Sequence, residues 1–289
     1  MSAPLLRPVL FLLSDFGWRD PYVGALKASF VAALTEARVT PIIDLCHDVA
    51  PHNIRHGAWI LAYALKTLPR GAVTLAVVDP GVGDPEQDGL IVYWPQRQQA
   101  FIAPDNGLLT PVLNAAGSDA RIAAVFSKDI PDNAPACKTF YGRDRYAPAA
   151  AHLTQALFDS ELDAFWRDRT RPLRRPPQLL PPGQTPQRAQ NSDLGPTLSG
   201  TIDHSDRFGN LLSDIPAGWL TPGKTAVVSG KNVSYPALCV SHYAQLADAN
   251  SDTIGIIASS HHTLEFCCFE ASAAERLQLR IGDPATITL

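Results

Sequence analysis

Between Val9 and about Leu157, short apolar runs alternate with longer amphipathic stretches. Residues 9–13 predict a buried strand, and Asp20 with Pro21 predicts the N-cap and first turn of a helix running to about Glu36. This alternation is typical of an α/β domain, in which a mostly parallel sheet carries helices on both faces.

The same unit repeats along the chain, with predicted strands over 39–45 and 72–78 and a predicted helix over 53–68. An acidic residue stands at the carboxyl end of each of the three strands, as Asp15, Asp44 and Asp79. Ligands of open α/β sheets bind beyond the carboxyl ends of the strands, so these aspartates are candidate ligand-binding residues. Each could equally cap a helix or a turn.

The second half of the chain has a different character. Residues 169–197 are rich in proline, arginine and glutamine, which predicts an extended connector. Beyond it, short alternating or β-branched segments separated by turns predict a small antiparallel β-barrel. We therefore expect an α/β domain over 1–170, a proline-rich connector over 171–196 and a β-barrel domain over 197–289.

Composition and charge narrow the range of functions. The 46% hydrophobic and 18% charged fractions indicate a globular protein. Lysine and arginine total 24 against 28 acidic residues, a net charge of −4, which disfavours nucleic-acid and membrane-surface binding. Because no apolar run is long enough for a signal peptide or a membrane span, we expect a cytoplasmic protein.

Metal and cofactor motifs are missing from the sequence. Its five cysteines form no CxxC pair, and its eight histidines include no HExxH set, so no metal site is predicted. The glycine loop over 79–84 follows a strand but lacks both the Walker lysine and the GxGxxG spacing, so no nucleotide cofactor is predicted. Taken alone, this loop is most simply a structural turn in which a ligand could approach the backbone.

Six ordered motifs resemble one family, the S-adenosyl-L-methionine (SAM) hydroxide adenosyltransferases, or SAM hydrolases, and their fluorinase and chlorinase relatives. The motifs are LSDFG with DPYVG at 13–24, DLCH at 44–47, VVDPGVG at 77–83, APDNGLL at 103–109, TFYGRD with APAAAHL at 139–153, and DRFGN at 206–210. The resemblance implies SAM as substrate, with no cofactor. It also implies a site between the α/β domain of one subunit and the β domain of the next in a homotrimer.

Family members displace methionine from the ribose 5′ carbon by direct substitution, which leaves adenosine when the nucleophile is water. By resemblance, Asp15 would hold the ribose hydroxyls, with Asn106 nearby. Asp20 and Tyr22 belong to the same opening motif as Asp15. A carboxylate suits a vicinal diol because each oxygen can accept one hydroxyl proton.

The C-terminal domain would supply the remaining substrate contacts. Asp206 and Asn210 resemble the pair that holds the amino and carboxylate ends of methionine, although Asp206 could simply be a turn aspartate. The segment around Phe269 and Ser272 resembles the adenine-binding stretch. Phe269 replaces the usual asparagine; its ring can stack on a purine but cannot make a bidentate amide contact.

The catalytic positions depart from the family pattern. Hydrolases of the family carry an aspartate, an arginine and a histidine thought to activate water, and this chain keeps the aspartate as Asp79. The arginine position falls near Glu86, and Tyr141 replaces the histidine. Tyr141 cannot act as a base near neutral pH, but it can orient a water that Asp79 polarises.

Three functions stay open. The first is SAM hydrolysis with Asp79 and Tyr141 as catalytic residues. The second is halide transfer: Tyr141 and Gly142 match the chlorinase version, whereas Asp79 would repel a halide 4 Å away by about 4 kcal/mol at an effective dielectric of 20. The third is a protein that binds SAM or adenosine without turnover.

Overall fold

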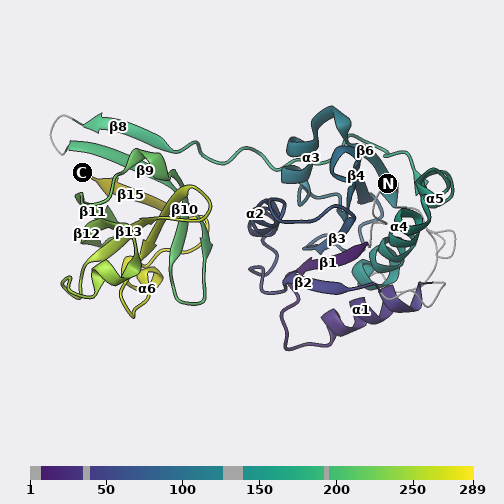
Figure 1. Ribbon diagram of the computed structural model, residues 1–289, viewed down its shortest axis with the longest axis horizontal. Coiled ribbons are helices and arrows are strands. Elements are labelled where there is room, and N and C mark those ends of the chain that lie inside the picture. Colours follow the sequence, from purple (N-terminus) through teal and green to yellow (C-terminus); the bar gives the residue numbers. More distant parts are fainter. Residues whose placement is uncertain (1–7, 35–39, 126–138, 192–194) are drawn as a thin grey trace, which may run out of the picture. The chain divides into compact units, whose positions relative to one another are not determined.

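The computed structural model describes residues 8–34, 40–125, 139–191 and 195–289. It consists of two compact units, Met1–Leu180 and Pro181–Leu289 (Figure 1). The division falls inside the stretch 171–196 that the sequence analysis interprets as a connector. The predicted helix end at Glu36 and strand start at Val39 lie outside the described residues.

The first unit is built on a seven-stranded mixed sheet with the order β2-β1-β3-β5-β4-β6-β7. β2, β1, β3 and β5 run parallel, whereas β4 is antiparallel to its neighbours β5 and β6, and β7 is antiparallel to β6. The strands are β1 (Val9–Ser14), β2 (Ile42–Cys46), β3 (Ala72–Val77), β4 (Gly89–Trp94), β5 (Gln99–Pro104), β6 (Arg121–Val125) and β7 (Thr170–Arg171).

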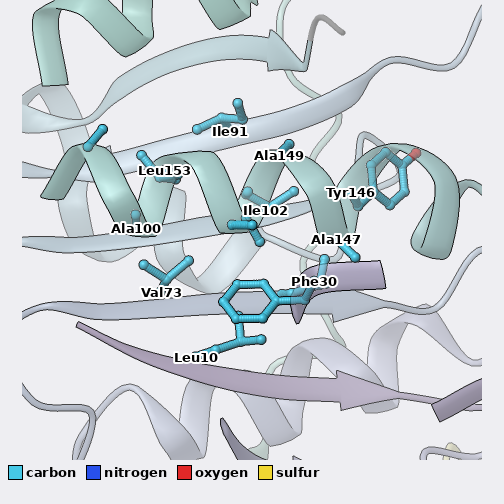
Figure 2. Packing of buried hydrophobic residues seen from close by; sticks show 14 of the residues in the cluster. Leu10, Phe30, Val73, Ile91, Ala100, Ile102, Tyr146, Ala147, Ala149 and Leu153 are labelled. Atoms are coloured by element: carbon cyan, nitrogen blue, oxygen red, sulfur yellow. The ribbon is translucent and has the colours of Figure 1, made fainter. Parts of the chain in front are cut away.

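Helices cover both faces of this sheet, as predicted. Their bounds are α1 (Tyr22–Ala32), α2 (Ile54–Ala64), α3 (Thr110–Ala116), α4 (Ala147–Asp159) and α5 (Leu162–Arg169), with a π-helical turn, η3 (Gly142–Tyr146), leading directly into α4. On one face, α4 lies across the central strands, and Phe30 of α1 packs beside it (Figure 2). α2 and α3 pack against the other face.

Strand periodicity explains the two-sided burial. In β3 every residue is buried: Val73, Leu75 and Val77 face α4, while Ala72 and Ala76 face α2. Successive side chains of a strand point to opposite faces, so a central strand covered on both sides is apolar throughout. The prediction of a fully buried strand here is confirmed.

Two local predictions were wrong. Asp20 does not cap α1: Pro21 is the N-cap, no side chain caps the helix, and the first helical bond runs from the Ala25 N–H to the Pro21 carbonyl. Asp44 does not stand at the carboxyl end of its strand but in the middle of β2, because the strand runs from Ile42 to Cys46. The helix predicted over 53–68 begins one residue later, at Ile54, because Asn53 is its N-cap, with its side chain accepting a hydrogen bond from the His56 N–H.

The second unit is a closed barrel. Seven strands run in the order β10-β14-β13-β12-β11-β15-β9, and the pairing of β9 with β10 closes the ring, while β8 extends it at β9. One neighbouring pair, β12 and β13, is parallel, so the prediction of antiparallel strands throughout was wrong for this pair. The strands are β8 (Gln187–Asn191), β9 (Gly195–Ser205), β10 (Leu211–Pro216), β11 (Thr225–Ser229), β12 (Ser234–Val240), β13 (Ile254–Ala258), β14 (Thr263–Cys267) and β15 (Pro284–Thr288), with a short helix α6 (Ala273–Leu277).

The proline-rich stretch joins the units without being wholly extended. Leu173 and Leu180 pack on the α2 face of the first unit, and the Leu180 N–H donates to Oγ1 of Thr110. Residues 187–191 form β8 of the barrel. Within the described ranges, none of the helices combines the length and hydrophobicity that a membrane span requires.

Candidate functional site

The parallel strands β1, β3 and β5 are neighbours, so their carboxyl ends meet at one edge of the sheet. Asp15 follows β1 directly, Asp79 follows β3 by two residues, and Asn106 follows β5 by two residues. The topology therefore brings these three predicted site residues to the same edge, where open α/β sheets bind ligands.

The carboxylate of Asp79 is half-buried and has one engaged oxygen. Its Oδ1 accepts a hydrogen bond of 2.9 Å from Nε2 of Gln87. Its Oδ2 is buried, and no described residue donates a hydrogen bond to it. Burial raises the pKa of Asp79; hydrogen bonds from Gln87 and the Gly81 N–H partly offset this, and the negative charge of Asp15 adds to it.

Asp15 and Asn106 are held by the backbone around them. Oδ2 of Asp15 accepts a 2.9 Å hydrogen bond from the N–H of His52, a residue with φ of 62°. Asn106 donates from Nδ2 to the carbonyl of Val78 at 2.8 Å, which ties the end of β5 to the turn that carries Asp79. No described residue donates to Oδ1 of Asp15, which is left for a ligand, while Asn106 also has a structural role.

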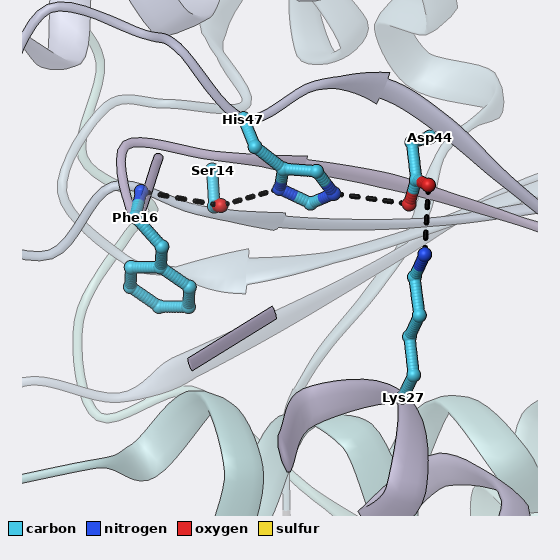
Figure 3. A network of polar contacts seen from close by, with 5 residues as sticks. All are labelled: Ser14, Phe16, Lys27, Asp44 and His47. Carbon is cyan, nitrogen blue, oxygen red and sulfur yellow. Dashed lines mark hydrogen bonds and ion pairs between the residues drawn. The ribbon is translucent and has the colours of Figure 1, made fainter. Parts of the chain in front are cut away.

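A chain of polar side chains, buried at Ser14 and His47, supports the Asp15 loop (Figure 3). Oγ of Ser14 lies 2.6 Å from Nδ1 of His47, whose Nε2 lies 3.0 Å from Oδ1 of Asp44, and Lys27 pairs with Oδ2 of Asp44 at 2.7 Å. Burial alone would raise the pKa of Asp44, but Lys27 and His47 lower it overall. The order resembles a Ser-His-Asp triad, yet Oγ of the fully buried Ser14 also accepts from the Phe16 N–H at 3.4 Å, so the chain positions the loop.

Three aromatic rings gather beside this loop. Phe16, Tyr22 and Phe140 contact one another edge to face, with centroids 5.5 to 5.9 Å apart. Tyr22 begins α1 and is 48% exposed, while Asp20, just before it, is exposed. The cluster joins the Asp15 loop to the segment that leads into η3.

Tyr141 and Gly142 stand at the start of η3. Tyr141 is 7% exposed, and the guanidinium of Arg145 lies over its ring at 4.2 Å. A Cβ added at Gly142 would meet Val77 and Leu26 at ordinary contact distances, so a small side chain fits there. π-helical turns occur frequently at functional sites. This one places Tyr146 fully inside the unit, where burial, and then the charge of Asp79, raise its pKa well above the usual range.

The barrel unit gathers the other predicted residues. Oδ1 of Asp206 accepts from the N–H groups of Phe208 and Asn210, and Oδ2 accepts from Nδ2 of Asn210, each at 2.9 Å. Ser272 caps α6 and contacts Gly209 of the same turn, while Phe269 is 44% exposed. Asp206 is therefore a turn aspartate that retains one accepting position.

The described residues contain no group of three or more histidine, cysteine, aspartate or glutamate side chains that could hold a metal ion. His56 is buried, and its Nδ1 accepts from the Ala50 N–H. His52 precedes α2 instead of lying on it.

Comparison with known protein families identifies both units. The model of the SAM hydroxide adenosyltransferase N-terminal domain matches residues 10–161, more than half of the chain, and that of the C-terminal domain matches residues 200–286. The chain belongs to the SAM hydroxide adenosyltransferase family. The resemblance noted from the sequence motifs is thereby confirmed.

Relatives of this family member include SAM hydrolases and, at greater distance, a fluorinase. It is 36% identical over 221 residues to "(R)-S-adenosyl-L-methionine hydrolase" of Thermus thermophilus, covering 73% of this chain and 75% of the relative. It is 30% identical over 208 residues to the protein of the same name from Methanocaldococcus jannaschii, covering 72% and 66%. A fluorinase of Actinopolyspora mzabensis is more distant, with 28% identity over 245 residues and 74% of each chain covered.

Solved structures agree with the fold of this SAM hydroxide adenosyltransferase family member. The crystal structure of an uncharacterized conserved protein from Thermotoga maritima matches with a TM-score of 0.74 and 25% identity, over 96% of this chain and 99% of that one. The predicted fold class, an α/β domain followed by a small β-barrel, is confirmed.

Sequence reasoning missed two side chains beside Asp79. Neither Gln87 nor Tyr146 was singled out from the sequence. No sequence signal marks Gln87, because its approach to Asp79 depends on the path of the loop. Glu86, where the family arginine was sought, has a 76% exposed side chain that pairs with Arg174 at 3.8 Å.

Proposed function

We propose that this protein hydrolyses SAM to adenosine and L-methionine. Water attacks the ribose 5′ carbon while the C5′–S bond breaks and its electron pair goes to sulfur. One proton leaves the attacking water, so the positive charge of the sulfonium is replaced by a released proton. Family membership and relatives named as SAM hydrolases support this reaction.

The observation that carries the proposal is the carboxylate of Asp79, whose Oδ2 is buried and accepts from no described residue. A carboxylate whose pKa is raised by burial is a better proton acceptor than an exposed one. Asp79 would align the water and accept its proton, and Tyr141 would help to orient that water. A sulfonium is an excellent leaving group, so alignment and partial desolvation of the water supply the rest.

Substrate binding is assigned to the other predicted residues. The free Oδ1 of Asp15 would accept from the ribose hydroxyls, next to Asn106, with Asp20, Tyr22 and Gly142 around them. In the barrel unit, Asp206 and Asn210 would hold the methionine ends, and Phe269 and Ser272 the adenine. The accepting position left on Asp206 suits an ammonium group.

Two alternatives rest on particular residues. The tyrosine–glycine pair at 141–142 and the fluorinase relative favour a halide adenosyltransferase, whereas the half-buried Asp79 carboxylate opposes an anionic nucleophile. The altered positions at 86 and 141 would also suit a protein that binds SAM or adenosine without turnover.

Assembly and location are part of the proposal. The family resemblance supports a homotrimer, and light scattering after size-exclusion chromatography tests it.

The net charge of −4 supports a small-molecule partner, with neither nucleic acid nor a membrane involved. The described cysteines are all free thiols, as expected in the reducing cytoplasm: Cys46, Cys239, Cys267 and Cys268. Cys137 lies outside the described residues. Direct substitution needs no cofactor, so exhaustive chelation should leave the rate unchanged.

The test is to incubate the purified protein with SAM, with and without chloride, and to identify products by liquid chromatography and mass spectrometry. We expect adenosine and methionine in equal amounts under both conditions, and loss of turnover in Asp79→Ala. Formation of 5′-chloro-5′-deoxyadenosine would instead establish the halide transferase. Tight binding of intact SAM without turnover would establish the binding protein.

A further inference from the structure

The side chain of Gln87 is the one described side chain hydrogen-bonded to the carboxylate of Asp79. Its Nε2 lies 2.9 Å from Oδ1, and because an ionised carboxylate only accepts, the amide must donate. Oδ2 stays buried without a donor. The contact therefore fixes the rotation of the carboxyl group and leaves one defined oxygen for another partner.

Gly81 leaves the room that this contact needs. A Cβ added at Gly81 would overlap Oε1 of Gln87, which is the free end of a flexible side chain. The φ of Gly81 is not positive, in contrast to that of Gly83 at 96°, so Gly81 is needed for space and not for backbone conformation. The turn after β3 thus accepts the Gln87 amide in a fitted position.

The loop that carries Gln87 contains a turn of its own and is anchored to the rest of the unit at Asp88. The N–H of Glu86 donates to Oδ1 of Asp84 at 2.9 Å, and the N–H of Asp105, at the end of β5, donates to the carbonyl of Asp88 at 2.8 Å. The side chain of Asp88 is 4% exposed and pairs with Arg171 at 2.5 Å and Arg174 at 3.5 Å. A loop held at these points can present one side chain to Asp79 in a fixed place.

We infer that Gln87 is a positioning residue for the hydrolysis: its amide holds Oδ1 of Asp79 so that Oδ2 faces the attacking water. The inference rests on the proposed function of Asp79. A neutral amide suits this role because it orients the carboxylate without adding a charge that would bind the carboxylate in an ion pair. Asp79 keeps its full charge to accept the proton.

The charged and titratable groups near Asp79 determine in which direction the pH profile of hydrolysis should move when the Gln87 amide is removed. Asp15, from the loop after β1, raises the pKa of Asp79, while the Gln87 amide lowers it; Tyr146, from η3, also interacts with the Asp79 charge. Removing the amide therefore raises the pKa of Asp79 further. Since hydrolysis requires the ionised form, the acid limb of the kcat/KM profile should move to higher pH.

The experiment compares SAM hydrolysis by wild type, Gln87→Met and Gly81→Ala across pH. Methionine keeps an unbranched side chain but has no donor, and the alanine methyl displaces the amide while Gln87 remains. We expect each variant to lose roughly 10- to 100-fold in kcat, the range for a hydrogen bond to a charged group, with KM for SAM within about twofold. The double variant should be no worse than Gln87→Met. Glu86→Gln, an exposed change in the same loop, should leave the rate and pH profile unchanged.

The outcomes separate two failures. Turnover by wild type, with the kcat and acid limb of Gln87→Met unchanged, would overturn the positioning role alone. Additive losses in the double variant would also overturn it, because Gly81→Ala would then act by another route. If wild type forms no adenosine, the proposed function is wrong and the positioning role falls with it.

Discussion

Replacing Arg171 by leucine should destabilise the first unit, because it removes the nearest partner of a buried carboxylate. The side chain of Asp88 is 4% exposed and that of Arg171 26%, with 2.5 Å between the paired atoms. Breaking a buried ion pair costs about 3–5 kcal/mol, but Arg174 remains at 3.5 Å, so we expect about 2 kcal/mol. At about 2–4 °C per kcal/mol for a unit of this size, Tm should fall by about 4–8 °C.

Tryptophan fluorescence during thermal and urea unfolding is a suitable assay, because four of the five tryptophans lie in the first unit. Arg167→Leu is the matched control: Arg167 pairs with Asp168 at 3.6 Å, and both side chains are largely exposed, so the loss should stay below about 1 kcal/mol. Equal Tm values for Arg171→Leu and Arg167→Leu would show that the Asp88 pair does not hold the loop.

Three further changes test separate parts of the site. Asp79→Asn should abolish hydrolysis yet raise Tm at neutral pH. Burial raises the pKa of Asp79, so the charged carboxylate destabilises the fold above that pKa, and the neutral amide removes this cost. A lower Tm would contradict this. Ser14→Ala should cost about 1–3 kcal/mol in urea unfolding, because Nδ1 of the buried His47 loses its partner; an unchanged midpoint would be evidence against the buried chain. Gly89→Ala should cost about 1–3 kcal/mol, because its methyl would overlap the ring of Tyr146; full stability would show that the ring can move away.

Much of the α/β unit could be predicted because its signals are local. The unbroken apolar run of β3 requires a strand covered on both faces, and the end of that strand fixes where Asp79 emerges. Asp15 follows β1 for the same reason. The resemblance then assigned these positions a substrate, which periodicity alone could not do.

The features that could not be predicted depend on distant partners. Asp44 was expected at a strand end, but it lies within β2 and pairs with Lys27, 17 residues earlier, and with the buried His47. The contact between Gln87 and Asp79 depends on the path of a loop whose Asp88 is held by Arg171, 83 residues later in the chain. Such contacts leave no periodic signal in the sequence, because their geometry is set by the assembled sheet and not by neighbouring residues.

The most direct test of the central claim is to run the reaction in ¹⁸O-labelled water and determine the mass of each product. Attack of water at the ribose 5′ carbon places one labelled oxygen in the 5′ hydroxyl of adenosine and none in methionine, and Asp79→Asn should form neither product. Unlabelled adenosine, or wild-type protein that returns intact SAM, would contradict the account.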